Sequence, residues 1–432
     1  MLITNARILN PFGTTDYIDN GFILIKNGVI IKVAAGQSDD SSNEIVNLKG
    51  KTVLPGMINA HTHLYSSLAL GMPVPKQQPK NFQEILKFIW WKLDAALDEN
   101  TNAISYKIGL MDSLRNGVTT VIDHHSSQNF IKGSLALLAD TAAELGVNIS
   151  LAFETSDRNG NDRFKSGCME NLETIKKYAA FTYVWPLFGM HASFTLSDDS
   201  LKYISEISKN IENFGIHVHL SEDNCDELNA QGLGYKSVID RLSKFNLLNK
   251  NSYLIHGIHM QDFDIDTIMQ NEANLIHNPT SNANNGVGIL PSSTINTVNA
   301  GLGTDGKQSN MLVEANEGHL IRNSFPNSDS EKVDYIELLF KNNPTIIKKI
   351  FKQKVGHLDT GYKADLVIYD YQPKTEINNS NYLSHIQFGL GTPSDVITNG
   401  QFQIRNNEFI NIDESKIKQE AKLLSKQLWD KM

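Results

Sequence analysis

The chain has 432 residues, of which 40% are hydrophobic and 20% charged, and its formal net charge is −9. This length predicts either one large barrel or two domains. The acidic balance argues against a nucleic-acid or anionic-membrane partner, because such partners need a basic surface to neutralise phosphate groups. Two cysteines occur, Cys168 and Cys225, without a CxxC pair, and this usage favours a reducing, cytoplasmic location.

Both ends of the chain have β character. Residues 1 to about 52 read as short strands, with a hairpin predicted at Lys26-Asn27-Gly28. Strand patterns return after about residue 355 and include a second hairpin near 396–404. Because a small β layer cannot bury both of its faces, we expect residues 1–52 and 355–432 to form one composite β-sandwich domain. A last amphipathic helix over about 413–429 would pack on the domain surface, or alternatively form a homodimer contact.

Between residues 53 and 354, short apolar strands alternate with helical segments. Eight such segments in about 300 residues predict an α/β fold, a TIM-type (β/α)8 barrel with its catalytic groups at the carboxyl ends of the strands. The predicted strands begin near Val53, Val118, Ile149, Val184, Ile216, Tyr253, Ala273 and Ala300.

The first strand of this region, read as one apolar run from Val53 to Ile58, leads into His61-Thr62-His63. Side chains alternate along a strand, so the two histidines project to the same side and could hold a divalent metal. Other histidines and carboxylates also fall at predicted strand ends. These are Asp123, His124, His125, Glu154, His191, His219, Glu222, His256, His277 and Asp305.

A mononuclear zinc or iron hydrolase needs three or four protein ligands and one open position for water, whose pKa falls to about 7 on the metal. Asp305 could also help to accept the water proton, and Glu222 could carry that proton to a ring nitrogen of the substrate. His256 could orient the hydroxide or stabilise charge on the attacked carbon. The candidate ligands are His61, His63, His219 and Asp305.

Six motifs spread over most of the chain carry a resemblance. They are Pro55-Gly56 with His61-Thr62-His63, His219-Leu220-Ser221-Glu222, His256-Gly257-Ile258-His259, His277-Asn278-Pro279-Thr280-Ser281-Asn282, Gly303-Thr304-Asp305-Gly306 and Ala364-Asp365-Leu366-Val367. With these motifs the chain resembles the amidohydrolase superfamily, in its ATZ/TRZ-type deaminase and chlorohydrolase branch. Within that branch it is most similar to the SsnA-type aminohydrolases. The segments that suggest this subgroup are Trp90–Asp94, Ala96–Glu99, Val121–His125, Phe153–Arg158 and His191–Thr195.

The resemblance implies one divalent metal ion, with zinc preferred over iron, bound by His61, His63, His219 and Asp305. It also implies Glu222 as the proton shuttle and His256 as its catalytic partner. The predicted fourth strand lacks the lysine that binuclear members carboxylate, which favours a single ion. Besides His191, which the resemblance places against the substrate, the candidates for substrate contact are His124, His125, Glu154, Arg158 and Trp90.

These residues predict a metal-dependent aminohydrolase that releases ammonia from a small amino-substituted nitrogen heterocycle, such as a purine-, pterin- or guanine-like ring. One alternative is hydrolysis of another C–N bond or of a C–Cl bond. A second alternative is a metal-stabilised binding protein without turnover. For His217 we expect a hydrogen-bonded core position, and the aromatic side chain of Trp90 could instead serve packing.

Overall fold

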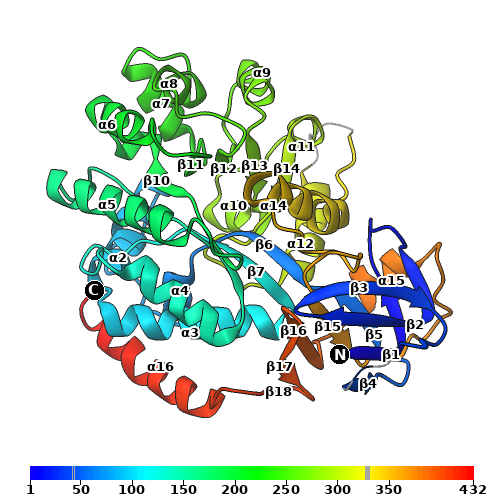
Figure 1. Ribbon diagram of the computed structural model, residues 1–432. Helices are drawn as coiled ribbons and strands as arrows, with labels where there is room; N and C mark the ends of the chain where they lie inside the picture. The colour runs from blue at the N-terminus through cyan, green and yellow to red at the C-terminus, as the bar shows by residue number, and fades with distance from the viewer. Residues whose placement is uncertain (41, 43, 326–330) are drawn as a thin grey trace.

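In the computed structural model, which describes residues 1–40, 42, 44–325 and 331–432, strands from both ends of the chain share one nine-stranded sheet (Figure 1). Its order is β18-β17-β16-β15-β5-β1-β2-β3, with β4 beside β1. The antiparallel pairing of β5 with β15 joins the two ends of the chain. The amino-terminal strands are β1 (Leu2–Leu9), β2 (Tyr17–Lys26), β3 (Val29–Ala35), β4 (Ile45–Asn47) and β5 (Thr52–Pro55). The carboxyl-terminal strands are β15 (Leu366–Tyr369), β16 (Asp395–Thr398), β17 (Gln401–Arg405) and β18 (Glu408–Phe409).

The predicted hairpin between β2 and β3 is present. Asn27 and Gly28 both have positive φ, at 51° and 74°. This conformation suits the tight turns that join right-twisted antiparallel strands, and Asn-Gly is the residue pair that adopts it most readily.

The middle of the chain forms two arcs of parallel strands. The first contains β6 (Met57–Thr62), β7 (Val118–Asp123), β8 (Asn148–Leu151) and β9 (Val184–Pro186), and the second contains β10 (Phe188–Ala192), β11 (Ile216–Leu220), β12 (Tyr253–His256), β13 (Asn274–His277) and β14 (Asn299–Leu302). Isolated parallel bridges at Thr155–Met190 and Thr62–Asp305 link the arcs at their two edges. Because β9 and β10 are two parts of the predicted fourth strand, each of the eight predicted strand positions holds a strand.

The apolar run from Val53 to Ile58 is two strands, and our prediction of one strand was wrong. β5 ends at Pro55 and pairs with β1 and β15, whereas β6 begins at Met57 and pairs with β7. The break falls at Gly56, where a Cβ atom would come within 2.1 Å of the Thr119 hydroxyl oxygen. Both strands are buried, so apolar patterning alone gives no sign of the break.

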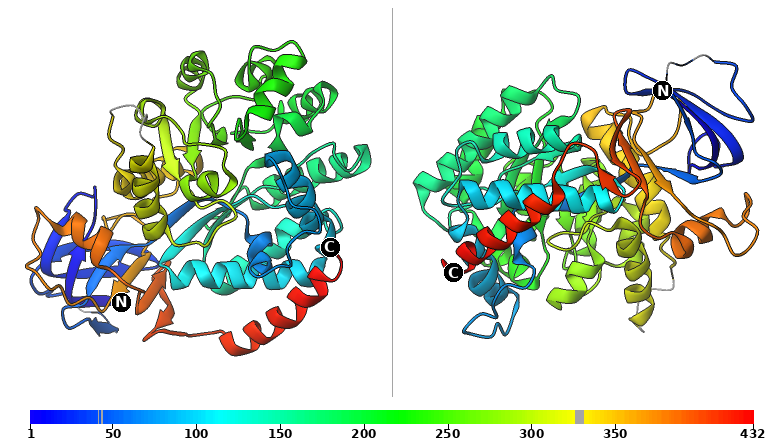
Figure 2. Two further views of the ribbon diagram at one scale, coloured as in Figure 1. Left: turned by 180° about the vertical axis from the view of Figure 1, so that it is seen from behind. Right: turned by 90° about the horizontal axis from the view of Figure 1, so that it is seen from below.

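Helices follow the strands and cover the outside of the arcs (Figures 1 and 2). The longer ones are α3 (Glu99–Arg115), α4 (Ser134–Leu145), α5 (Asn161–Tyr178), α6 (Asp198–Ser208), α7 (Asn224–Gly232), α9 (Asp262–Gln270), α12 (Met311–Ser324), α14 (Asn343–Phe351), α15 (Tyr382–Gly389) and α16 (Glu414–Trp429). Shorter helical segments are η1 (Leu64–Ala69), α1 (Phe82–Ile85), η2 (Leu86–Trp90), α2 (Trp91–Ala96), η3 (Ser193–Thr195), α8 (Val238–Lys244), α10 (Pro279–Asn285), α11 (Ser292–Thr297), α13 (Tyr335–Glu337) and η4 (Leu338–Asn342). In the part of the chain that the structure describes, no helix is long and apolar enough to cross a lipid bilayer.

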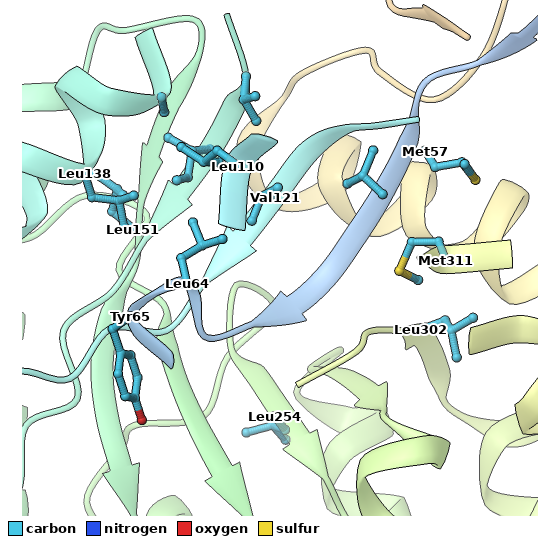
Figure 3. Close-up of a cluster of buried hydrophobic side chains, with 14 of the residues drawn as sticks. Met57, Leu64, Tyr65, Leu110, Val121, Leu138, Leu151, Leu254, Leu302 and Met311 are labelled. Atoms are coloured by element: carbon cyan, nitrogen blue, oxygen red, sulfur yellow. The ribbon is translucent and has the colours of Figure 1, made fainter. Parts of the chain in front are cut away.

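The main hydrophobic core lies between the strands and the surrounding helices (Figure 3). In it, Val121 of β7 and Leu110 of α3 are fully buried together with Leu64 of η1. A second cluster includes Ile58 and Ile276, which come from different arcs. Burial of these side chains provides the main driving force for folding, and it fixes the strands whose carboxyl ends carry the polar residues.

The C-terminal helix α16 runs along α3 in the views of Figures 1 and 2. Arg115 of α3 forms an ion pair with Glu414 at the start of α16. At the other end, the indole N–H of Trp429 donates to the Leu68 carbonyl of η1 at 3.0 Å. This predicted amphipathic helix therefore packs mainly on α3, with further contacts to α2 and η1.

Gly189 in β10 lies close to the backbone of Phe153, which follows the end of β8. A Cβ atom at this position would lie 2.2 Å from the Phe153 carbonyl oxygen and 2.5 Å from its carbon. Because backbone atoms cannot rotate away, we expect Gly189→Ala to lower the free energy of unfolding by about 1–3 kcal/mol. Denaturant titration measures this loss, with Gly391→Ala as the control because no atom lies within 4 Å of its Cβ position. Equal stability of the two variants would contradict the prediction.

Candidate active site

The four candidate metal ligands meet at the carboxyl ends of β6, β11 and β14. The Nε2 atom of His63 lies 2.9 Å from Oδ1 of Asp305 and 3.2 Å from Nε2 of His219. The Nε2 atom of His61 lies 3.6 Å from the same Asp305 oxygen. One ligand atom from each of the four residues lies within 4.8 Å of the others, a spacing that allows all of them to contact one ion.

The outer ring nitrogens of two ligands are held by backbone carbonyls. Nδ1 of His63 donates to the His124 carbonyl at 2.6 Å, and Nδ1 of His219 donates to the His191 carbonyl at 2.9 Å. Since a carbonyl oxygen can only accept, Nδ1 carries a proton in both rings, and in a neutral ring the Nε2 lone pair faces the centre. Two neutral rings with Nε2 atoms 3.2 Å apart would repel each other, and either a metal ion between them or a proton on His63 removes this repulsion. The residues therefore fit a divalent metal with nitrogen and oxygen ligands, such as zinc or iron.

The electrostatics of the site also favour a cation. Burial lowers the pKa of His61 to about 3, so this ring stays neutral and free to act as a ligand. Burial would lower the pKa of His63 too, but its hydrogen bond with Asp305 and the charges of Asp305 and Glu154 raise that pKa to about 10. The two carboxylates thus create a negative potential at the point where the four ligand atoms meet.

Glu222 and His256 lie beside the second oxygen of Asp305. Nε2 of His256 is 3.4 Å from Oε2 of Glu222 and 4.0 Å from Oδ2 of Asp305. Burial lowers the pKa of His256 to about 4, whereas burial and the Asp305 charge raise the pKa of Glu222 well above its ordinary value. A carboxyl group of raised pKa beside a neutral imidazole can accept and return a proton near neutral pH.

Two of these residues have unusual backbone conformations. His256 and Asp305 have φ values of 77° and 55°, a region that residues other than glycine rarely adopt. Such strain persists only where the surrounding structure enforces it, and it is concentrated at functional sites. Here it directs both side chains toward the same centre.

The centre opens into a cavity of about 700 Å³. Four of the predicted substrate contacts lie in its wall, namely Trp90, Glu154, Arg158 and His191. His124 and His125 are fully buried behind this wall. The ring of His124 stacks on that of His217 with 4.0 Å between centroids, and His125 contacts the Tyr106 hydroxyl at 3.0 Å.

His217 occupies the core position that we expected. It is fully buried, and its Nε2 atom lies 3.0 Å from Nδ1 of the candidate ligand His61. A residue that hydrogen-bonds to a metal ligand, without contacting the metal itself, fixes the orientation of the ligand ring. His217 therefore supports the His61 side chain from behind.

Sequence reasoning missed Asp94 in the cavity wall. Its Oδ2 atom accepts a hydrogen bond from Arg158 at 2.8 Å, and the Arg158 guanidinium lies 5.2 Å from the centre of the Trp91 ring. Asp94 lies within a segment that carried the resemblance, but only its contact with a residue 64 positions later marks it as part of the site. Three polar residues of α10, namely Ser281, Asn282 and Asn285, were also missed.

Residues 52–402 match the model of the amidohydrolase family. The chain belongs to this family. This membership confirms the resemblance that the motifs carried, and it makes the chain a hydrolase.

This amidohydrolase is similar to several characterised proteins. It is 28% identical over 428 residues to 5′-deoxyadenosine deaminase of Methanocaldococcus jannaschii, covering 92% of this chain and 94% of the relative. A zinc-containing adenosine deaminase from Xanthomonas campestris superposes with a TM-score of 0.84 at 19% identity, over 99% of this chain and 98% of the other. Guanine deaminase from C. acetobutylicum, solved with guanine in its active site, gives 0.77 at 18% identity, over 93% and 99%. The amidohydrolase thus has the fold of these enzymes.

Proposed function

We propose that this amidohydrolase is a metal-dependent deaminase that releases ammonia from an amino-substituted nitrogen heterocycle of the purine, pterin or guanine type. One observation carries the proposal: Asp305 lies between three inward-facing histidine Nε2 atoms on one side and Glu222 with His256 on the other. The relatives named as deaminases of adenosine-type compounds and of guanine support the same class of reaction.

The reaction adds water to the carbon that bears the amino group, breaks the C–N bond and releases ammonia. A divalent ion held by His61, His63, His219 and Asp305 would supply a water molecule whose pKa is lowered to about 7. Glu222 accepts a proton at Oε2 and passes it to the ring nitrogen of the substrate. The neutral His256 directs its Nε2 toward the same centre, where an N–H donor stabilises developing negative charge.

A single ion is proposed, with zinc preferred. The zinc in the Xanthomonas campestris protein supports the choice of metal. The lack of a lysine in β9 and β10 supports a single ion. We also propose that residues 53–354 form a TIM-type barrel and that residues 1–52 and 355–432 form a composite β domain. The pairing of β5 (Thr52–Pro55) with β1 and β15 supports the second assignment, and it adds residues 53–55 to the β domain, so that the first boundary falls at Gly56.

An ammonia-release screen tests the proposed function. Metal-replete protein is incubated with amino-substituted purines, pterins, pyrimidines and their nucleosides, and ammonia and the organic product are both quantified. We expect one ammonia for each oxo product formed. Release of chloride or an alkylamine from substituted triazines, without ammonia from the other compounds, would favour the alternative hydrolase. Absence of any turnover by fully metallated protein would contradict the deaminase proposal.

A further inference from the structure

The short helix α10 faces the proposed proton-transfer residues with three polar side chains. Each of them forms a hydrogen bond with a different one of these residues. The pairs are Ser281 with Asp305, Asn282 with His256 at 2.8 Å, and Asn285 with Glu222 at 3.1 Å. A single helix therefore contacts all three groups that the proposed reaction requires beside the metal.

The helix geometry explains how seven residues achieve this. Successive residues are rotated by about 100°, so positions 281, 282 and 285 fall within an arc of about 100° on one face. Ala283 points away and is exposed. Pro279 in the first turn and Gly286, with φ 67° at the end, limit the helix to these residues.

Asn285 acts on one particular oxygen of Glu222. Its side-chain amide donates to Oε1, while Oε2 faces Nε2 of His256 at 3.4 Å. The Glu222 side chain is 11% exposed and lines the cavity, so bulk water offers little competition for these positions. The amide occupies one of the two acceptor positions of Oε1 and leaves Oε2 free. A proton on Oε2, the oxygen that faces His256, is therefore compatible with this hydrogen bond.

We propose that Asn285 is the positioning residue of Glu222: it fixes the carboxyl group and keeps the transferable proton on the oxygen that faces the reacting centre. The proposal rests on the proposed function, because it needs Glu222 as the proton shuttle. An amide suits the task since it donates to Oε1 both before and after Oε2 is protonated. A cationic side chain at this position would instead hold Glu222 in its charged form.

The variant Asn285→Leu tests this role, because it removes the donor and keeps a side chain of similar size. We expect kcat to fall about 10- to 100-fold, part of the 10²- to 10⁴-fold that general acid–base catalysis contributes. KM should change by less than about threefold, and the metal content and melting temperature should stay at the parent values. Asn285→Ala, which also removes the donor, should show the same split between kcat and KM. Ala283→Leu, on the exposed side of the same helix, is the control and should keep the parent kcat.

Three outcomes would overturn the proposal. A kcat of Asn285→Leu within about twofold of the parent, with Glu222→Gln inactive, would remove the role of Asn285 and leave the proposed function intact. Equal losses in Asn285→Leu and Ala283→Leu would show a general disturbance of α10 rather than positioning of Glu222. Normal turnover of Glu222→Gln would refute the proposed function and this inference together.

Discussion

Glu222→Gln is expected to reduce turnover by about 10²- to 10⁴-fold while metal binding is retained. Glutamine preserves the size of the side chain and its carbonyl oxygen can still accept from Asn285, which donates at 3.1 Å to the native carboxylate. It cannot accept a proton at the position of Oε2, so the transfer to the substrate is lost. Glu222 is not one of the four proposed metal ligands, so metal binding should be unaffected.

Steady-state ammonia release and elemental analysis of the same sample measure these two effects. Circular dichroism and thermal melting show whether the variant is folded. Parent-like activity of Glu222→Gln would remove this residue from the mechanism. Loss of the metal together with activity would mean that Glu222 is a ligand rather than a proton shuttle.

Asp305→Ala and His61→Ala are each expected to abolish stoichiometric metal binding and, with it, detectable turnover. The Oδ1 atom of Asp305 lies 2.9 Å from Nε2 of His63 and 3.6 Å from Nε2 of His61. Removing the carboxylate leaves three neutral nitrogen ligands and takes away the negative charge that favours a cation. Loss of a residue that only hydrogen-bonds to a metal ligand already lowers metal affinity 10- to 100-fold. Loss of a residue that binds the metal directly should lower it further.

Metal content per chain after gel filtration tests this assignment. His319→Ala is a suitable control, because His319 is exposed and contacts Asn323 on its own helix α12. The control should retain the metal content of the parent protein. A full complement of metal in Asp305→Ala would show that the four residues are not the ligand set.

Asp305 connects the two halves of the proposed site. Its Oδ1 atom faces His61 and His63, whereas Oδ2 accepts from Ser281 and lies 4.0 Å from His256. A rotation of this carboxylate would disturb ligand binding and proton transfer together. The strained backbone at Asp305, with φ 55°, and the hydrogen bond from Ser281 both restrict such a rotation.

Much of the fold and of the site could be predicted from local sequence. The eight strand positions follow from short apolar runs, and the alternation of side chains places His61 and His63 on one side of a strand. The carboxyl ends of the parallel strands of a barrel all lie at the same face of the barrel. His219 and Asp305 could therefore be assigned to the same centre as His61 and His63. The hairpin at Asn27-Gly28 could also be predicted locally, from the backbone conformations that these two residues prefer.

Tertiary contacts decided the remaining features. The break at Gly56 depends on Thr119 and on pairing with strands at both ends of the chain. Asp94 joins the site through Arg158, and no local pattern distinguishes it from an ordinary helix carboxylate. The burial of His124 and His125 behind the wall, and the contact of Asn285 with Glu222, likewise depend on residues distant in sequence. Periodicity and strand ends are properties of neighbouring residues, whereas the identity of a side chain's partner is fixed only when the whole chain has packed.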